Sequence, residues 1–392
     1  MLPFDVQTDP TRCTGCGACV QACPHDCIML QQDEEGFDYP VVDDTCCVEC
    51  GICESVCPAN RDWRSLHETV TEPQLYAAWH LDSAIRQRSS SGGVFSALAQ
   101  QVLNDGGVVF GAGFSPDLHL RHVAIQDWVH LDQLRGSKYL QSSTEKTYVE
   151  ARQALDVGKL TLYSGTPCQI SGLYSFLGGN PQGLYTVDLI CHGVPSPLVF
   201  ERYLHYLELR SDNRVASLDS RDKRRGWRLF SMVVTMQDGS AFSKTLYKDP
   251  YLICFLRNLC LRPACMACPY AATQRIGDIT LGDFWGIHRS HPELDDDRGV
   301  SEVLINTSRG QRLFDASDSL LFTQECRLED GMQQMLMGPS EASPKRAEFF
   351  ADLALLSFEE IRRKYLKPRR VSLLRRIAGR AKRTLKQVLY ST

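Results

Sequence analysis

The chain has 392 residues, of which 43% are hydrophobic and 23% charged, and a formal net charge of −4. This length exceeds one small core and predicts two or three domains, and the composition is ordinary for a soluble globular protein. No apolar run reaches the length of a membrane span, and the start lacks the form of a secretory signal. The 17 cysteines are therefore expected in a reducing cytoplasm, as metal ligands rather than disulfides.

Two near-copies of one cysteine pattern open the chain. C-x2-C-x2-C-x3-C-P covers residues 13–24 and recurs over residues 47–58. This spacing is typical of bacterial two-cluster ferredoxins, in which the fourth cysteine of each run binds the other cluster. Nearby glycines let the backbone pass close to the sulfurs. We therefore assign one [4Fe–4S] cluster to Cys13, Cys16, Cys19 and Cys57, and a second to Cys47, Cys50, Cys53 and Cys23.

Zinc and disulfides are the alternatives for these cysteines. Zinc sites usually use two C-x2-C pairs, not three close ligands and a distant fourth. Cys27 and Cys46 fall outside both patterns, and Cys46 competes with Cys47, although only Cys47 keeps the repeat spacing. Residues 1–66 are thus expected to form a ferredoxin module whose clusters stabilise a small core.

From residue 74 onward, strand and helix patterns alternate. Residues 74–155 predict a strand at 75–80, a helix at 94–103 and a strand at 108–113. Residues 156–338 predict strands at 160–164 and 184–190, helices at 169–177 and 198–209, and an antiparallel hairpin within 215–246 that turns at 237–240. The remainder, 339–392, is predicted to be a helical and increasingly basic tail.

Two of the predicted strands end at a cysteine. If these strands are neighbours in a parallel sheet, Cys168 and Cys191 open onto one edge, where cofactors bind in open α/β sheets. Each thiol also lies near a helix N-terminus, which favours the thiolate. A further C-x2-C pair completes a set of four, so a third cluster is predicted on Cys168, Cys191, Cys265 and Cys268.

Several alternatives remain for this third set. Cys168 or Cys191 can be a small buried core residue, and Cys168 can be a catalytic thiol. The four cysteines can also bind structural zinc. Cys260 is a rival ligand for Cys265 or Cys268.

From Arg362 to the end there are twelve Lys or Arg and no Asp or Glu. Apolar residues from Leu374 to Leu389 recur at helical spacing within this segment. Such a basic amphipathic helix can contact an anionic membrane surface peripherally, dock on an acidic partner, or remain solvated. Nucleic acid is not expected as a partner, because aromatic interleaving and binding motifs are absent.

Six segments in order resemble the coenzyme F420 hydrogenase/dehydrogenase beta-subunit family, over residues 74–330. They are Ser89-Ser90-Ser91-Gly92-Gly93, Gly136-Ser137-Lys138-Tyr139, Gly165-Thr166-Pro167-Cys168-Gln169, the Cys191–Pro197 loop, Cys265-x2-Cys268-Pro269 and Gly282-Asp283-Phe284-Trp285-Gly286. The resemblance implies a non-Rossmann FAD site beside an iron–sulfur cluster. It also implies hydride exchange with a second carrier, which is coenzyme F420 in the founding members. Other members lie among surface-polysaccharide genes.

The flavin is expected at residues whose hydroxyl and glycine N–H groups can hold a pyrophosphate at a helix N-terminus. The alternative is an ordinary capped helix after a polar loop. Lys138 is expected near a phosphate or the flavin ring. The predicted cofactor-binding residues are Ser89, Ser90, Ser91, Gly92, Gly93 and Lys138. Asp283 and Trp285 carry no assigned role.

Together these features predict an α+β and α/β protein: a dicluster ferredoxin module, an α/β flavin-binding iron–sulfur domain, and a basic helical tail. The expected function is an iron–sulfur flavoprotein oxidoreductase that exchanges electrons with a redox partner protein or ferredoxin-like donor, and a hydride with an organic substrate. One alternative is an electron-transfer subunit without substrate chemistry. Another is a redox-sensing assembly factor at the inner face of the membrane.

Overall fold

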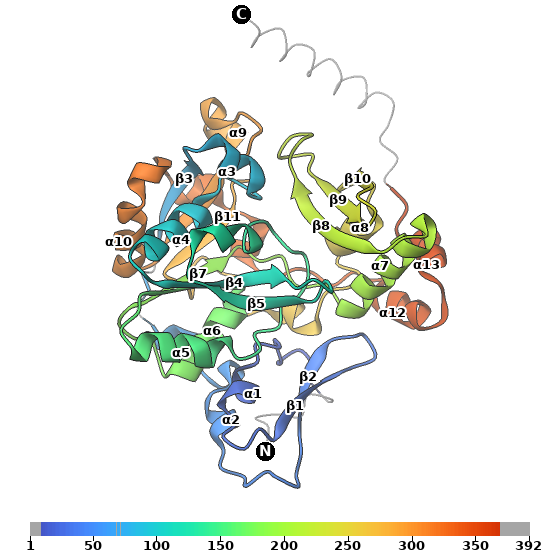
Figure 1. Ribbon diagram of the computed structural model, residues 1–392, viewed down its shortest axis with the longest axis horizontal. Helices are drawn as coiled ribbons and strands as arrows, with labels where there is room; N and C mark the ends of the chain where they lie inside the picture. The colour runs from blue at the N-terminus through green and yellow to red at the C-terminus, as the bar shows by residue number, and fades with distance from the viewer. Residues whose placement is uncertain (1–8, 68, 71, 369–392) are drawn as a thin grey trace, which may run out of the picture.

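The computed structural model describes residues 9–67, 69–70 and 72–368 of the chain. An N-terminal module lies at the bottom of Figure 1, beneath a large sheet covered by helices. A smaller sheet with its own helices lies beside the large one. In the described residues, no helix is long and apolar enough to cross a membrane.

The N-terminal module is built from two short helices and one hairpin. The helices are α1 (Ala18–Ala22) and α2 (Ile52–Ser55), and β1 (Ile28–Gln32) pairs antiparallel with β2 (Asp38–Val42). Each helix begins after a glycine in the left-handed region, Gly17 with φ 78° and Gly51 with φ 72°. Glycine adopts this conformation without steric strain, so the same local turn recurs in both cysteine repeats.

The large sheet has eight strands in the order β13-β3-β12-β11-β7-β6-β4-β5. The neighbours β11, β7, β6 and β4 run parallel, and the outer pairs are antiparallel. The strands are β3 (Gln74–His80), β4 (Val108–Phe114), β5 (Leu120–Ile125), β6 (Thr161–Ser164), β7 (Leu184–Leu189), β11 (Ile279–Asp283), β12 (Ser301–Ile305) and β13 (Leu321–Cys326). The predicted parallel neighbours β6 and β7 are confirmed.

Helices cover both faces of this sheet, because its central strands are apolar on both sides. Along β4, Val109 packs toward α4, whereas Val108 and Phe110 pack toward α5 and α6. The helices that flank the sheet are α3 (Ser83–Arg88), α4 (Val94–Asn104), α5 (Thr147–Asp156), α6 (Pro167–Leu177), α9 (Ile287–Ser290), α10 (Ser308–Ala316) and α11 (Gln334–Met337).

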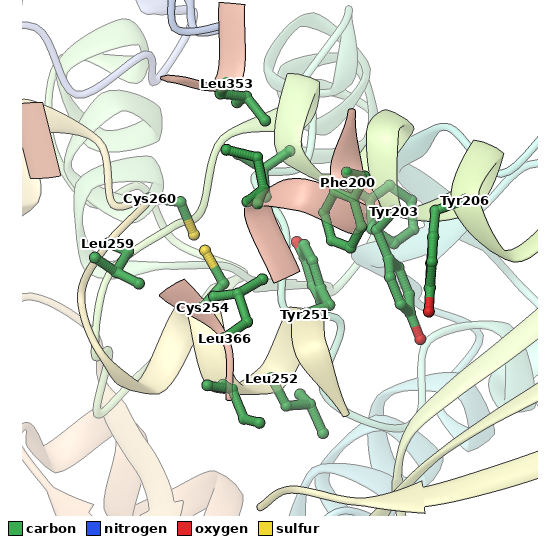
Figure 2. Close-up of a cluster of buried hydrophobic side chains, with 14 of the residues drawn as sticks. Phe200, Tyr203, Tyr206, Tyr251, Leu252, Cys254, Leu259, Cys260, Leu353 and Leu366 are labelled. Atoms are coloured by element: carbon green, nitrogen blue, oxygen red, sulfur yellow. The ribbon is translucent and has the colours of Figure 1, made fainter. Parts of the chain in front are cut away.

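The smaller sheet has the order β10-β9-β8 and is wholly antiparallel. The predicted hairpin is present as β9 and β10, with its turn at Asp238-Gly239, and β8 adds a third strand. Its core also contains Tyr203, Tyr251 and Leu353 (Figure 2). The elements are β8 (Val215–Asp222), β9 (Ser231–Met236), β10 (Ala241–Thr245), α7 (Pro197–Ser211), α8 (Pro250–Leu256), α12 (Arg346–Leu355) and α13 (Phe358–Tyr365). The apolar repeat from Leu374 to Leu389 lies outside the described residues.

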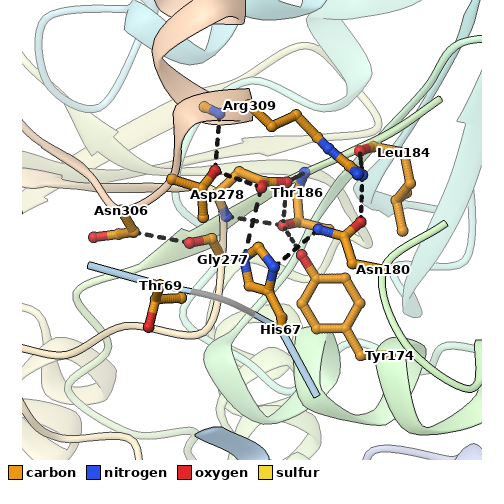
Figure 3. A network of polar contacts seen from close by, with 12 residues as sticks. His67, Thr69, Tyr174, Asn180, Leu184, Thr186, Gly277, Asp278, Asn306 and Arg309 are labelled. Carbon is orange, nitrogen blue, oxygen red and sulfur yellow. Dashed lines mark hydrogen bonds and ion pairs between the residues drawn. The ribbon is translucent and has the colours of Figure 1, made fainter. Parts of the chain in front are cut away.

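A buried polar network attaches the segment after the N-terminal module to the large sheet (Figure 3). His67 lies 3.6 Å from the carboxylate of Asp278, and its Nδ1 lies 3.0 Å from the amide nitrogen of Asn180. Asp278 also accepts hydrogen bonds from the backbone N–H and the hydroxyl of Thr186. Because these groups are buried, their mutual bonds fix where the chain enters the sheet.

Candidate functional site

The first four predicted ligands share one cavity. Cys13, Cys16, Cys19 and Cys57 line a space of about 290 Å³ together with Trp63, Pro269 and Tyr270. Burial, together with the nearby Cys13 and Cys57, raises the pKa of Cys19 to about 12. Four mutually close thiols from residues 13–57 are the donor set that a cubane cluster requires.

The second four predicted ligands share another cavity. Cys23, Cys47, Cys50 and Cys53 line it together with Ile28, Val42, Val48 and Ile52. Cys46 is exposed and its thiol donates to the carbonyl of Asp43, so Cys47 is the residue of this pair that faces the cavity. Cys27 is buried and interacts with Cys46.

The third predicted set is also brought together. Burial raises the pKa of Cys191 well above its ordinary value, and Cys265, Cys168 and Cys268 raise it further as neighbours. The backbone N–H of Val194 points at the sulfur of Cys265, 3.4 Å away. The start of α6, the loop after β7 and the segment that follows α8 therefore meet at one place.

Cys260 does not join this set. It is fully buried in the core of the smaller sheet, where its sulfur faces that of Cys254 (Figure 2). The two thiols interact with each other. Cys260 thus lies in the core of the smaller sheet, whereas Cys265 lies beside Cys168 and Cys268 of the third set.

The expectation that both strand-end thiols lie near a helix N-terminus is correct for Cys168 and wrong for Cys191. Cys168 is the second residue of α6, whereas Cys191 lies six residues before α7 begins at Pro197. Burial also raises the pKa of Cys168, against the hydrogen bond from Thr166. A thiolate at either position therefore depends on a bound metal, because burial outweighs the helix dipole.

The geometry of the cysteine sets bears on the zinc alternative. Within the described ranges, no group of three or more His, Cys, Asp or Glu is arranged to hold a single metal ion. A mononuclear zinc needs all its sulfurs about 2.3 Å from one point. Cysteine sulfurs that each bind a different iron of a four-iron cluster lie further apart than those around one zinc.

The first and third sets are joined through α6. Cys168 and Gly172 are four residues apart on this helix and so share a face. A Cβ built on Gly172 would lie 2.9 Å from Cys16 Cβ and 3.0 Å from its sulfur. Only a glycine here lets the N-terminal module approach the helix that carries Cys168.

Arg262 joins the same two sets by hydrogen bonds. Its Nε donates to the carbonyl of Cys13 over 2.9 Å, and its Nη2 donates to the carbonyl of Asp38 over 2.8 Å. Its other terminal nitrogen donates to the side chain of Gln141 over 2.9 Å. Because Arg262 begins the short helix that carries Cys265, a cation lies between the two cysteine sets.

The predicted flavin segment lies between α3 and α4, and most of its polar groups are already bonded. The hydroxyls of Ser89 and Ser91 donate to the carbonyls of Ile85 and Val300. The N–H of Gly92 donates to the Ser301 hydroxyl. A Cβ on Gly92 would lie 2.3 Å from the Ala78 carbonyl oxygen, so this glycine serves close packing on the sheet.

The two halves of the predicted flavin site are in contact. The N–H of Ser137 donates to the Ser90 hydroxyl over 2.5 Å. Lys138 directs its amine to the carbonyls of Gln133 and Arg135, and burial lowers its pKa to about 7. Gly93 is the N-cap of α4, which begins at Val94 as the sequence predicts.

A buried polar cluster beside Ser90 was missed by sequence reasoning. Arg221 donates to the Ser90 carbonyl, to the Tyr139 hydroxyl and to the Asp283 carboxylate. Trp227 also donates to Asp283, and its ring stacks on Trp285 with centroids 4.7 Å apart. The Arg221 Nε has no hydrogen-bond partner among the described residues.

The sequence feature that could have pointed to this cluster is the basic run that contains Arg221. Residues 221–228 hold five Lys or Arg and begin at the end of β8. Such a run usually lies on a solvated face. Here Arg221 and Lys223 turn inward, and the latter donates to the carbonyls of Arg86, Ser91 and Arg298.

Comparison with known families gives three matches along the chain. The N-terminal model of coenzyme F420 hydrogenase/dehydrogenase, beta subunit, matches residues 75–147, and the C-terminal model matches residues 158–325. A 4Fe-4S dicluster domain matches residues 12–61. No curated protein matches the chain.

Among solved structures, a chain of the F420-reducing [NiFe] hydrogenase complex from Methanosarcina barkeri, determined with xenon derivatization, is similar. The identity is 19% and the TM-score is 0.45, over 78% of this chain and 98% of that chain.

Proposed function

Because the chain belongs to the coenzyme F420 hydrogenase/dehydrogenase beta-subunit family and begins with a 4Fe-4S dicluster domain, we propose that it is an iron–sulfur flavoprotein oxidoreductase. In this proposal electrons move between the clusters of the N-terminal module and FAD. The flavin exchanges a hydride with coenzyme F420 or another organic carrier. Four-iron clusters supply single-electron transfer, and a flavin supplies the conversion to two electrons.

One observation carries the proposal: three sets of four cysteines follow one another through the molecule. The second set lies in the outer half of the module, the first set in the inner half, and the third at the sheet edge next to it. The contact of Cys16 with Gly172 and the bonds of Arg262 hold the inner two sets together. This succession supports electron transfer along the chain.

The surrounding residues keep water away from the inner sets. The Tyr148 hydroxyl donates to the carbonyls of Cys16 and Gln169 and is fully buried. Tyr270 is buried between the first and third sets and packs on Trp63. Arg262 also lies 3.8 Å from the sulfur of Cys13, where a cation favours added negative charge.

The residues next to Ser90 fit a flavin in part. Arg221 has an unpaired N–H in a buried place, which invites an acceptor such as a phosphate or a ring oxygen. Trp285 is 39% exposed and lies over Arg221, so its indole offers an apolar surface for an aromatic ring. We therefore expect Arg221 and Trp285 to contribute to the flavin site along with Gly93 and Lys138.

The decisive experiment is anaerobic purification of the full chain, with iron and flavin measured on one sample. We expect about twelve iron, from three four-iron clusters, and one FAD per chain. Replacing Cys265 with Ser is expected to remove about four of these iron atoms. The matched control is Cys326→Ser on β13, which is expected to lose none. Eight iron and no flavin in the unaltered protein would contradict both the third cluster and the flavin.

A second candidate is an electron-transfer subunit that hands electrons to a catalytic partner and has no substrate of its own. The internal bonds of Ser89, Ser91 and Gly92 favour it, because they leave those groups no spare donor for a pyrophosphate. About twelve iron without flavin, with no turnover of F420 by the reduced protein, would select this candidate.

A further inference from the structure

The two cysteine repeats of the N-terminal module have unlike surroundings. In the inner repeat, the carbonyls of Cys13, Thr14 and Cys16 accept hydrogen bonds from Arg262, Gln141 and Thr144 of the α/β body. A Cβ on Gly15 would lie 2.6 Å from Gln141 Nε2, so the covering side chains leave no room there. The inner repeat is thus closed by an interface.

The outer repeat presents the corresponding residues to solvent. Val48 and Glu49 stand where the inner repeat has Thr14 and Gly15. Val48 is 61% exposed and Ile52 is 38% exposed, and both line the cavity of the second cysteine set. Cys50 of that set is exposed as well. In Figure 1, α2 of this repeat lies further from the body than α1.

Glu49 retains a carboxylate at a position that suits glycine. Its φ is 53°, in the left-handed region, as is that of Gly15 at 68°. No ion pair between described residues involves Glu49 or its exposed neighbour Glu54. A strained, exposed and unpaired acidic residue beside the second cavity is better explained by a contact with another molecule than by stability of the fold.

The charge of the N-terminal module indicates which kind of molecule would bind at this face. Residues 9–66 contain eleven Asp or Glu and three Arg, with no Lys. Asp26, Asp44, Glu49 and Glu54 are exposed in the segments that carry the second cysteine set, as are the apolar residues Val48 and Ile52. A surface with an apolar centre and an acidic rim complements a partner with an apolar centre and a Lys/Arg rim, and repels an acidic one.

We propose that this outer face, formed by Asp26, Asp44, Val48, Glu49, Ile52 and Glu54, is the docking surface for a basic redox protein. The partner is expected to place a cation over Glu49 much as Arg262 lies over the inner repeat. This inference rests on the proposed electron-transfer function and names its partner class. It argues against an acidic, ferredoxin-like donor at this face.

The test compares two haem proteins of similar size, a basic c-type and an acidic b-type cytochrome, as probes of the full chain. The chemically reduced protein gives one electron to each ferric haem, which becomes ferrous, and no proton moves. We expect faster reduction of the basic cytochrome at low ionic strength, with the preference lost near about 0.5 M salt. Binding of the oxidised basic cytochrome is measured separately by sedimentation.

The double variant Glu49→Lys/Glu54→Lys is expected to slow reduction of the basic cytochrome about tenfold and to weaken its binding by a similar factor. The control Glu201→Lys/Asp318→Lys makes the same change in net charge on α7 and at residue 318, and should alter neither. Iron content is measured for each variant.

An equal loss in the control, or faster reduction of the acidic cytochrome, would overturn the docking surface while the iron content stays normal. Absence of iron from the unaltered protein would instead overturn the proposed function. Absence of flavin alone leaves this test valid, because only the outer cysteine set is needed.

Discussion

At the scale of single residues, Glu49 stands out because its backbone is strained although the fold does not require a side chain there. Glu49 adopts a left-handed conformation that costs a non-glycine residue about 1–2 kcal/mol. The equivalent Gly15 avoids this cost. The comparison of the two repeats therefore shows that this turn requires a positive φ but does not require the carboxylate of Glu49.

Replacing Glu49 with Gly is expected to stabilise the N-terminal module by about 1 kcal/mol, because the strain disappears. The same change should slow reduction of a basic cytochrome, because the carboxylate is lost. Heating the anaerobic protein while following its visible absorbance measures the first effect, and stopped-flow mixing the second. Lower thermal stability of the variant would show that the glutamate side chain supports the fold.

Glu302 is a second residue whose state is set by burial. Burial raises its pKa to about 8, against the hydrogen bond from Gln333. The folded protein thus binds a proton at Glu302 that the unfolded chain releases above about pH 4.5. Stability from this group is fully present below that value and falls as the pH rises toward 8.

We expect Glu302→Gln to be more stable than the unaltered protein by about 4 kcal/mol at pH 8, and by less than about 1 kcal/mol at pH 5. The amide keeps an acceptor for Gln333 and removes the titration. Chemical unfolding of both proteins at the two pH values checks this. A gain of the same size at both values would mean that packing, and not proton release, is responsible.

At the scale of elements, α6 carries the contact on which the arrangement of the cysteine sets depends. Its N-terminus is fixed by a capping box, in which Thr166 and Gln169 bond to each other's backbone. Pro167 occupies the first turn, where its missing N–H has no cost. Cys168 and Gly172 are thereby placed toward the N-terminal module.

Gly172→Val is expected to separate the module from α6, since even a Cβ would contact Cys16 at 2.9 Å. Overpacking of this kind typically costs about 1–3 kcal/mol. We predict loss of about four iron atoms from the first set, with the outer set retained. Iron analysis measures this. The control is Gly338→Val, because the backbone there is extended and nothing lies within 4 Å of an added Cβ. Full iron content in Gly172→Val would show that the module tolerates the displacement.

At the scale of the whole molecule, the sequence predicted the architecture well where local rules apply. The strand and turn at residues 161–168, the next strand and the hairpin turn at Gly239 follow from apolar runs and glycines, and the structure has them. The two N-terminal cysteine sets were predicted from spacing, and the third from the ends of two strands taken as parallel neighbours together with a C-x2-C pair. How closely the first and third sets approach each other is decided by long-range packing that spacing does not encode.

The remaining features depended on contacts between distant segments. Arg221 lies in a basic run that reads as a solvated surface, yet it is buried against Ser90, 131 residues away. Cys260 looks like a ligand because it stands five residues before Cys265, but the core around Tyr251 and Cys254 takes it up. Neither outcome follows from the local pattern, because both are decided by which surface each element buries.

The close seating of Cys16 on Gly172 has a consequence for how fast the protein can work. Tunnelling of an electron weakens steeply with each added ångström, and the missing side chain at Gly172 lets Cys16 lie close to the helix that carries Cys168. The module needs no swinging motion to bring its inner centre within range. In the proposed function, the rate of turnover is then set by how fast the redox partner and the substrate bind and leave at the two ends of the series of cysteine sets.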